Sequence, residues 1–274
     1  MANRMLLNTR DVTVVDVHCP TTSITGPMEL QGLDCFELLF VRSGCFTFQD
    51  SRGRVFADPT TCVLGPPRQL ADIAHPAAGG DIFTQISLSA EAWHEVASDD
   101  QVPLASQVTG GMQIEARSLL VAGRRGVGDM AVEEGALNLV AAALAQEEPA
   151  RIASGRPSTN RRRRQLTEDA RVILTSNPAL ASIREIAVEL GCSPYHLSRT
   201  FRAHTGKGLA EYRTQLRVNL ALQFIADGGM PLAEVASQTG FADQAHLTRT
   251  VRDWTGRTPD RFRRSVTNLE RHGG

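Results

Sequence analysis

The chain has 274 residues, of which 42% are hydrophobic and 22% charged, and its formal net charge is -1. This length favours two domains, each able to bury a sizeable core, and the composition is ordinary for a soluble globular protein. No run of about 18 or more apolar residues occurs, so we expect no membrane-spanning helix. Residues 1–10 turn polar too early for a signal peptide.

The charge is divided unevenly between the two halves of the chain. Residues 1–150 contain 9 Arg against 19 Asp and Glu, a net charge of -10, whereas residues 151–274 contain 20 Lys and Arg against 11 Asp and Glu, a net charge of +9. This asymmetry predicts that the C-terminal half meets a polyanion. The alternative is that the two halves neutralise each other across an interface.

Residues 10–90 are predicted to be mainly strands. Short apolar segments alternate with turn signals rich in Gly, Pro and Asp, a pattern typical of a sandwich or barrel. The clearest predicted strands are residues 36–41, 44–48, 54–56, 61–64 and 82–88.

Two helices, residues 112–125 and 129–146, are predicted to follow the strands. In the second helix, one face is apolar because its hydrophobic residues recur at spacings of three and four. This face either packs on the sheet of its own domain or forms a homodimer interface with the same helix of a second chain. It consists of Val132, Ala136, Leu139, Val140 and Ala143.

Residues 149–164 are the predicted linker between a first domain, residues 1–148, and a second, residues 165–266. The segment from 148 to 160 has few large apolar residues and two prolines, as linkers commonly do. The run of four arginines at 161–164 is either a solvated face or a contact with phosphates.

The cysteines indicate reduced thiols in a cytoplasmic protein, because their number is odd, their spacings are irregular and no CxxC pair occurs. We expect them to be small buried hydrophobic side chains, the alternative being thiol or metal sensing. We expect no cofactor and no metal site, since His18, His75 and His94 are scattered and form no HxH pair. The cysteines are Cys19, Cys35, Cys45, Cys62 and Cys192.

An internal repeat dominates the C-terminal half. The segment HLSRTFRAHTG at 196–206 recurs as HLTRTVRDWTG at 246–256, an offset of 50, and EIA at 185–187 matches EVA at 234–236, an offset of 49. The chain therefore contains a duplicated unit with one residue inserted in the second copy.

Each copy of the repeat is predicted to be a helix, a tight turn and a second helix. In the first copy, Ser182 caps the first helix, Gly191 makes the turn and Ser193 caps the second helix. In the second copy, Pro231 opens the first helix, Gly240 makes the turn and Asp243 caps the second. A small-residue turn followed by a helix with an apolar seam is typical of a DNA-reading helix-turn-helix motif.

A single helix, residues 208–226, is predicted to connect the two motifs. With about 19 residues at 1.5 Å each it spans roughly 28 Å, close to the ~34 Å between successive major-groove faces on one side of DNA. One chain could then read two adjacent groove segments without two-fold symmetry. Its predicted buried seam is Leu209, Tyr212, Leu216, Leu220 and Phe224.

The segment from about 165 to 265 resembles the AraC/XylS-type transcription regulators, and its closing run, residues 240–262, follows that family's signature almost throughout. The resemblance implies a DNA-binding regulator that commonly activates transcription beside RNA polymerase in response to a small-molecule effector. The N-terminal half is similar, more loosely, to the effector-binding domain of such regulators. The expected fold class is therefore α+β: an N-terminal cupin-like β-barrel with two helices of its own, then an all-α domain with two helix-turn-helix motifs.

Side chains near the start of each second helix are expected to reach base edges, and the family places base contacts at matching positions. Arg199 and Arg249 suit guanine, each with about 1–3 kcal/mol of discrimination, Gln244 suits adenine and Ala245 a thymine methyl group. For the two arginines the alternative is an ion pair or a phosphate contact. The expected base contacts are Tyr195, Ser198 and Arg199 in the first motif, and Gln244, Ala245, His246 and Arg249 in the second.

A second group of basic residues is expected to contact phosphates, which positions a protein on DNA without specifying sequence. For His196 and His246, a base contact is one interpretation, and packing or a phosphate contact is an equally weighted alternative. The expected phosphate contacts are Arg202, Lys207, Arg213, Arg217, Arg252 and Arg257.

The expected partners are thus double-stranded DNA, RNA polymerase, an effector of unknown identity and a second copy bound through the 129–146 helix. We expect no enzymatic activity. One alternative is a regulator that senses metal or redox state through N-terminal Cys and His residues. Another is a DNA-repair enzyme with the same DNA-binding module, although Cys19-Pro20 reverses the PC order that such an enzyme would need. A third is an interaction protein with a degenerate module.

Overall fold

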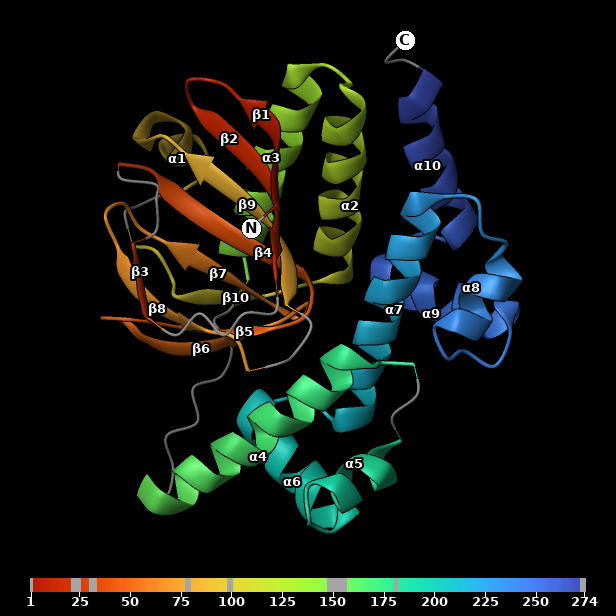
Figure 1. Ribbon diagram of the computed structural model, residues 1–274. Coiled ribbons are helices and arrows are strands. Elements are labelled where there is room, and N and C mark those ends of the chain that lie inside the picture. The colour runs from red at the N-terminus through yellow and green to blue at the C-terminus, as the bar shows by residue number, and fades with distance from the viewer. Residues whose placement is uncertain are drawn as a thin grey trace.

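The computed structural model describes residues 2–20, 26–29, 34–76, 80–97, 101–146, 157–179 and 182–271. The protein is mixed α+β. Residues 2–146 form what we call the sheet domain, which carries all of the described strands, and residues 157–271 form the helical domain (Figure 1).

The strands form two antiparallel sheets. One has the order β1-β2-β9-β4-β7-β10 and the other β3-β8-β5-β6. Among the described residues no strand pair joins the two sheets, so the predicted closure into a cupin-like barrel is not seen and the arrangement is an open sandwich. The strands are β1 (Ala2–Asn8), β2 (Val12–Cys19), β3 (Gly26–Glu29), β4 (Phe36–Ser43), β5 (Phe46–Asp50), β6 (Gly53–Ala57), β7 (Thr61–Gly65), β8 (Leu70–Ala74), β9 (Asp81–Leu88) and β10 (Ala105–Gln107).

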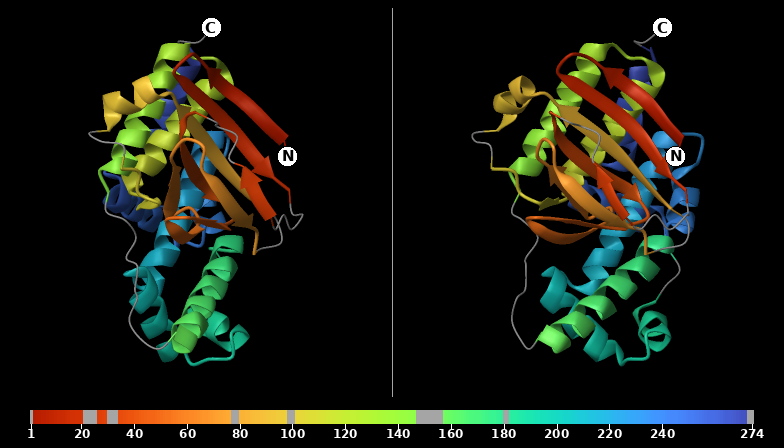
Figure 2. Two further views of the ribbon diagram at one scale, coloured as in Figure 1. Left: turned by 90° about the vertical axis from the view of Figure 1, so that its left-hand side faces the viewer. Right: turned by 60° about the vertical axis from the view of Figure 1, so that its left-hand side comes forward.

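The six-stranded sheet has helices on one side and the four-stranded sheet on the other (Figure 2), and its middle strand β4 is buried on both faces. Leu38 and Phe40 of β4 belong to the cluster that contains Trp93 and the helices of the sheet domain. Leu39 and Val41, which point the other way along the strand, pack towards the four-stranded sheet. This two-sided burial explains why β4 is almost continuously apolar rather than alternating.

Three helices cover one face of the six-stranded sheet: α1 (Ala90–Val96), α2 (Gly110–Arg125) and α3 (Asp129–Leu144). The apolar face of α3 that the sequence singles out is at most 2% exposed and lies in the same cluster as the sheet. The face therefore packs within its own domain, and the expectation that it forms a homodimer interface is wrong for these side chains, because they are already covered.

The helical domain contains both predicted helix-turn-helix motifs. The first is α5–α6 and the second α8–α9, and α7 connects them. Figure 1 shows α7 running from the first motif, at the bottom of the view, up to the second, at the right. The helices are α4 (Pro157–Ser176), α5 (Ile183–Glu189), α6 (Pro194–Thr205), α7 (Leu209–Asp227), α8 (Leu232–Gln238), α9 (Gln244–Thr255) and α10 (Pro259–Arg271).

The caps of these helices confirm the sequence prediction. The hydroxyl of Ser182 accepts a hydrogen bond from the backbone N–H of Glu185, whose carboxylate accepts one from the N–H of Ser182, a complete capping box. Ser193 and Asp243 are simple caps: their side-chain oxygens accept hydrogen bonds from the backbone N–H groups of His196 and His246 at the start of α6 and α9. The turns at Gly191 and Gly240 have φ of +62° and +76°, a conformation that favours glycine.

The second motif packs directly on the sheet domain. Ile114 and Val121 of α2 lie in one buried cluster with Leu222 and Ile225 of α7 and Val251 of α9. A Cβ atom added at Gly110, the first residue of α2, would lie 1.9 Å from the backbone oxygen of Trp254. The sheet domain and the second motif thus share one buried apolar cluster, to which the sheet domain contributes α2. Residues 157–164, which the sequence assigns to the linker, lie in α4.

Candidate DNA interface and its contact with the sheet domain

The predicted base-contacting residues lie in the first two turns of α6 and α9. Capping fixes the start of each helix, and a buried seam fixes its rotation: Leu197 and Phe201 in α6, Leu247 and Val251 in α9. The opposite face carries the predicted residues. Tyr195 is 75% exposed and Ser198 is half-buried. The exposed group also includes Arg199, Gln244, Ala245, His246 and Arg249.

Arg199 and Arg249 occupy equivalent positions in the two motifs, and both project into solvent. Neither makes a side-chain hydrogen bond or an ion pair with any residue that the structure describes. The alternative of an ion pair that supports the fold is therefore not what the structure shows. Two unpaired guanidinium groups on matching faces are available for an external acceptor, as guanine and phosphate both are.

His246 has a partly structural position. Its ring lies edge-on to Phe241 with 5.3 Å between ring centroids, and its Nδ1 accepts a hydrogen bond of 3.4 Å from the backbone N–H of Ala242. These contacts orient the ring at the start of α9.

The six predicted phosphate contacts fall into two groups. Arg202, Arg252 and Arg257 are exposed. The other three are at least half-buried: Lys207 donates to the Gln215 side chain at 3.1 Å, Arg217 donates to the backbone oxygens of Pro178 and Ala179 at 2.9 and 2.7 Å, and Arg213 has a buried Nε without a partner among the described residues. Lys207 and Arg217 thus hold the helical domain together in this structure.

Known proteins are similar to the C-terminal part of the chain. A family model described as a helix-turn-helix domain matches residues 186–265. MarA of Escherichia coli, a multiple antibiotic resistance protein, is 28% identical over 89 residues, which is 32% of this chain and 68% of MarA. A solved AraC-type regulator from Chromobacterium violaceum is 24% identical and covers 38% of this chain and 93% of that one, with a TM-score of 0.36. Residues 186–265 of the chain are thus similar to the helix-turn-helix domains of transcription regulators.

A third relative is the bifunctional transcriptional activator and DNA repair enzyme AdaA of Bacillus subtilis, 33% identical over 82 residues, which is 30% of this chain and 39% of AdaA. The chain spans less than half the length of this relative, and the match falls in the helix-turn-helix part. AdaA therefore says nothing about the activity of the sheet domain. Among the described residues, no helix has the length and apolar character needed to cross a lipid bilayer.

A buried carboxylate links the helical domain to the sheet domain. Asp58, between β6 and β7, is fully buried and pairs with the Arg171 guanidinium of α4 at 2.5 Å. The Tyr212 hydroxyl of α7 donates to the same oxygen at 2.5 Å. Burial and the adjacent Asp58 carboxylate both raise the pKa of Tyr212 well above its usual range, so the hydroxyl stays protonated as a donor. Sequence patterns do not predict this contact, because Asp58 lies more than a hundred residues from both Arg171 and Tyr212.

A second polar contact surrounds a cavity of about 100 Å³ between the domains. Three arginines of the sheet domain line it: Arg42, Arg117 and Arg124, with Gln223 and Asp227 of α7 on the opposite side. The Asp16 carboxylate pairs with Arg42 and Arg124. Arg117, which is 4% exposed, makes one hydrogen bond to the described residues, to the Asn219 side chain at 2.9 Å.

The charges of this cavity are incompletely balanced. Burial, and then the like charge of Arg42, lower the pKa of Arg117 to about 9. Burial lowers the pKa of Arg42 to about 10, against the opposing effect of Asp16, and its Nε has no partner among the described residues. Buried guanidinium groups with spare donors are costly unless an acceptor meets them.

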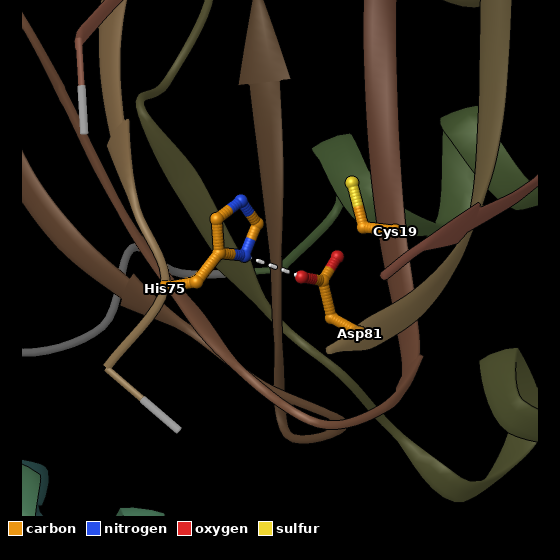
Figure 3. Close-up of side chains that lie close together, drawn as sticks. All are labelled: Cys19, His75 and Asp81. Atoms are coloured by element: carbon orange, nitrogen blue, oxygen red, sulfur yellow. Dashed lines mark ion pairs between the residues drawn. The ribbon is translucent and has the colours of Figure 1, made fainter. Parts of the chain in front are cut away.

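A third cluster lies inside the sheet domain, where the structure brings together Cys19, His75 and Asp81 (Figure 3). The sequence prediction left these residues apart, because His75 has no metal-ligand spacing to either of them. Cys45 and Cys62 lie elsewhere: the Thr175 hydroxyl of α4 donates to Cys45 Sγ, and the Cys62 thiol donates to the backbone oxygen of Ser106, each at 3.6 Å.

Proposed function

We propose that the chain is a sequence-specific transcription regulator that reads an asymmetric DNA site with both motifs of one polypeptide. The observation that carries the proposal is the pair of matching exposed faces on α6 and α9, each with an unpaired arginine, Arg199 and Arg249. The connecting helix α7 has 19 residues and so spans roughly 28 Å. That length suits two reading helices placed about one helical turn apart on DNA.

The base contacts in this proposal are the seven predicted residues, with His246 acting from an orientation that Phe241 fixes. The phosphate contacts are Arg202, Arg252 and Arg257, whose side chains are exposed; Arg252 also lies 3.8 Å from the exposed Asp253 carboxylate. We rank the other three lower. Lys207 and Arg217 would have to break hydrogen bonds within the helical domain to contact phosphate, and Arg213 is half-buried with a buried Nε.

We further propose that the effector is a small anion bound in the cavity between the domains. Arg117 supports this: its guanidinium is buried, lines the cavity and has donors to spare. A carboxylate or phosphate group there would contact the arginines of the sheet domain on one side and the Gln223 amide of α7 on the other. Because α7 sets the spacing of the two motifs, occupancy would bias the geometry that meets DNA.

Other parts of the proposal rest on the family resemblance. They are activation beside RNA polymerase, location in the cytoplasm and a relation of the open sandwich to cupin-like effector domains. A homodimer through α3 would have to use the exposed face of that helix, on which Met130 is 83% exposed.

The alternative of a Cys-dependent repair enzyme is disfavoured by the state of the thiols. Burial raises the pKa of Cys45 and Cys62 to about 12, and it also raises the pKa of Cys19, Cys35 and Cys192. A nucleophilic cysteine needs the opposite shift, because the thiolate is the reactive form.

A genome-wide footprint of the purified full chain at moderate salt tests the regulator proposal. We expect a small set of preferred, non-palindromic sites. Uniform binding to all sequences, or none, would reject it. The effector proposal is tested separately by thermal-shift screening against small carboxylates and phosphate esters. We expect stabilisation that Arg117→Met abolishes and that Arg10→Met, a change at an exposed arginine, leaves intact.

A further inference from the structure

Three side chains of metal-ligand type meet at one edge of the sheet sandwich. Cys19 is the last residue of β2 and Asp81 the first of β9, and they lie directly opposite each other in the antiparallel β2–β9 pair. Opposite residues project from the same face of a sheet. His75 follows β8, a strand of the other sheet. Their ligand atoms all lie within 4.8 Å of one another (Figure 3).

The backbone allows this approach through a glycine. Gly80, directly before Asp81, has a φ of +72°, and a Cβ atom there would lie 2.0 Å from the backbone oxygen of Cys19. No other residue type fits at this position without displacing β2. Gly80 therefore allows β9 to begin close to the end of β2, which places Asp81 beside Cys19.

The cluster is buried and its polar groups are poorly satisfied. Cys19 is 8% exposed, and the side chains of His75 and Asp81 are 6% and 0% exposed. Neither oxygen of Asp81 accepts a hydrogen bond from the described residues. His75 Nδ1 lies 2.6 Å from Asp81 Oδ1, an ion-pair distance, but without the geometry of a hydrogen bond. A buried carboxylate normally has donors, a counter-ion or a metal.

We propose that Cys19, His75 and Asp81 bind one divalent metal ion of the zinc class. A set of one sulfur, one nitrogen and one oxygen ligand suits zinc and disfavours magnesium and calcium, which prefer oxygen alone. In a tetrahedral zinc site the ligand atoms are roughly 3–4 Å apart. His75 and Asp81 would have to separate by less than about 1 Å to admit the ion.

Metal uptake requires the Cys19 thiol to release its proton to solvent, since the thiolate is the ligand. The three protein ligands leave a fourth coordination position for water or another small ligand. Because His75 belongs to one sheet and Cys19 and Asp81 to the other, the bound ion would tie the two sheets together at this edge. His18 and Ile82, the next pair along β2 and β9, line the arginine-lined cavity, so alternation along the strands places the Cys19 and Asp81 side chains on the opposite face of the sheet. Metal binding there does not depend on DNA binding.

Cobalt(II) chloride added to the full chain, after chelator treatment and under reducing conditions, is the test. Tetrahedral cobalt bound to a thiolate gives visible bands and a near-ultraviolet sulfur-to-metal charge-transfer band. We expect both, with one cobalt per chain, displacement by one equivalent of zinc, and a higher midpoint of thermal unfolding with zinc than without. Cys19→Ser should abolish the charge-transfer band, and Asp81→Asn should weaken cobalt binding at least about tenfold.

Two control variants separate this site from other thiols and imidazoles. Cys192→Ser changes a cysteine of the helical domain, and His18→Asn a half-exposed histidine of β2. Both should keep the wild-type spectrum. Absence of the charge-transfer band in the folded wild-type protein, its survival in Cys19→Ser, or its loss in Cys192→Ser would overturn the proposal and leave a His75–Asp81 ion pair beside a buried thiol. Circular dichroism confirms that each variant is folded.

Discussion

At the scale of single residues, the proposed readout of DNA sequence rests on two arginines. Arg199 and Arg249 were identified from the repeat alone, because their distance from the helix caps and from the apolar seam fixes which way they point. Lys207 and Arg217 were also predicted to contact DNA, but they make hydrogen bonds within the protein. Their local sequence is equally basic, but their partners, Gln215 and the Pro178 and Ala179 carbonyls, are set by tertiary packing.

Arg249→Ala should relax specificity at one base position, because the lost contact reads a base edge and is worth about 1–3 kcal/mol there. Arg252→Ala, one turn further along the exposed side of α9, should instead weaken binding to all sequences alike and lower its salt dependence. Affinities for a panel of single-base variants of the preferred site, at two salt concentrations, distinguish these effects. Equal loss on every sequence for Arg249→Ala would mark it as a phosphate contact.

Glu37→Gln should stabilise the protein at neutral and higher pH. Glu37 is buried in β4, accepts a hydrogen bond of 2.7 Å from Gln85, and has a pKa that burial raises. Because its folded-state pKa lies above its unfolded value, the folded state binds the proton more tightly, and the charged form costs stability at pH above the folded pKa. This cost disappears as the pH falls below the pKa that Glu37 has in the unfolded chain.

Thermal unfolding of the Glu37→Gln variant at pH 8 and pH 4 measures this effect. We expect a higher midpoint than wild type at pH 8 and a smaller difference at pH 4. Glu95→Gln, at an exposed position, should show no such trend. A lower midpoint for Glu37→Gln at pH 8 would contradict the assignment of a destabilising buried charge.

At the scale of elements, the helix-turn-helix helices were predictable because their caps and turns are local in sequence. The seam predicted for α7 was right at Leu209, Tyr212 and Leu216, which are buried. Leu220 and Phe224 are only half-buried, although Phe224 still packs against the buried cluster of the second motif. The second half of α7 turns a different face inward, with Leu222 and Ile225, because α2 packs there. No pattern within α7 reveals that neighbour.

Gly110→Ala should disturb the packing of the second motif on α2, because the added methyl group would meet the Trp254 backbone oxygen at 1.9 Å. We expect a loss of about 1–3 kcal/mol, as overpacking commonly costs, and faster amide exchange in α9. Gly111→Ala is the matched control, since its nearest contact would be 3.8 Å away, and it should be neutral or slightly stabilising. Equal behaviour of the two variants in denaturant unfolding would show that α2 and α9 are not packed as described.

At the scale of the whole molecule, the charge asymmetry allowed two interpretations, a polyanion partner or mutual neutralisation of the halves. The structure supports both interpretations in part. Asp58 with Arg171 and Arg54 with Glu168 pair across the domains, while Arg199, Arg202, Arg249 and Arg252 remain exposed. A single sequence does not reveal which charged residues pair across the domains. It also does not reveal that Cys19 and Asp81 are neighbours, because the pairing of strands cannot be deduced from it.

Asp58→Asn should weaken the attachment of the domains strongly, because it leaves the Arg171 charge buried without a carboxylate, a loss of about 3–5 kcal/mol. Glu168→Gln removes the partly exposed pair with Arg54 and should cost no more than about 1 kcal/mol. Asp72→Asn, at an exposed position of β8, is the neutral control. Denaturant unfolding of the full chain measures the free energy of unfolding of all three variants. If Asp58→Asn were as stable as Asp72→Asn, Asp58 would not stabilise the interface between the domains.

The central claim is that one chain reads two adjacent groove segments, each with its own helix. Its most direct test is the affinity of wild type, Arg199→Ala and Arg249→Ala for a library in which every base pair of the preferred site is substituted in turn. We predict an asymmetric site in which Arg199→Ala flattens the preferences of one segment and Arg249→Ala those of another, centred about 10–10.5 base pairs apart. A palindromic site, or two variants that flatten the same base pairs, would contradict the claim.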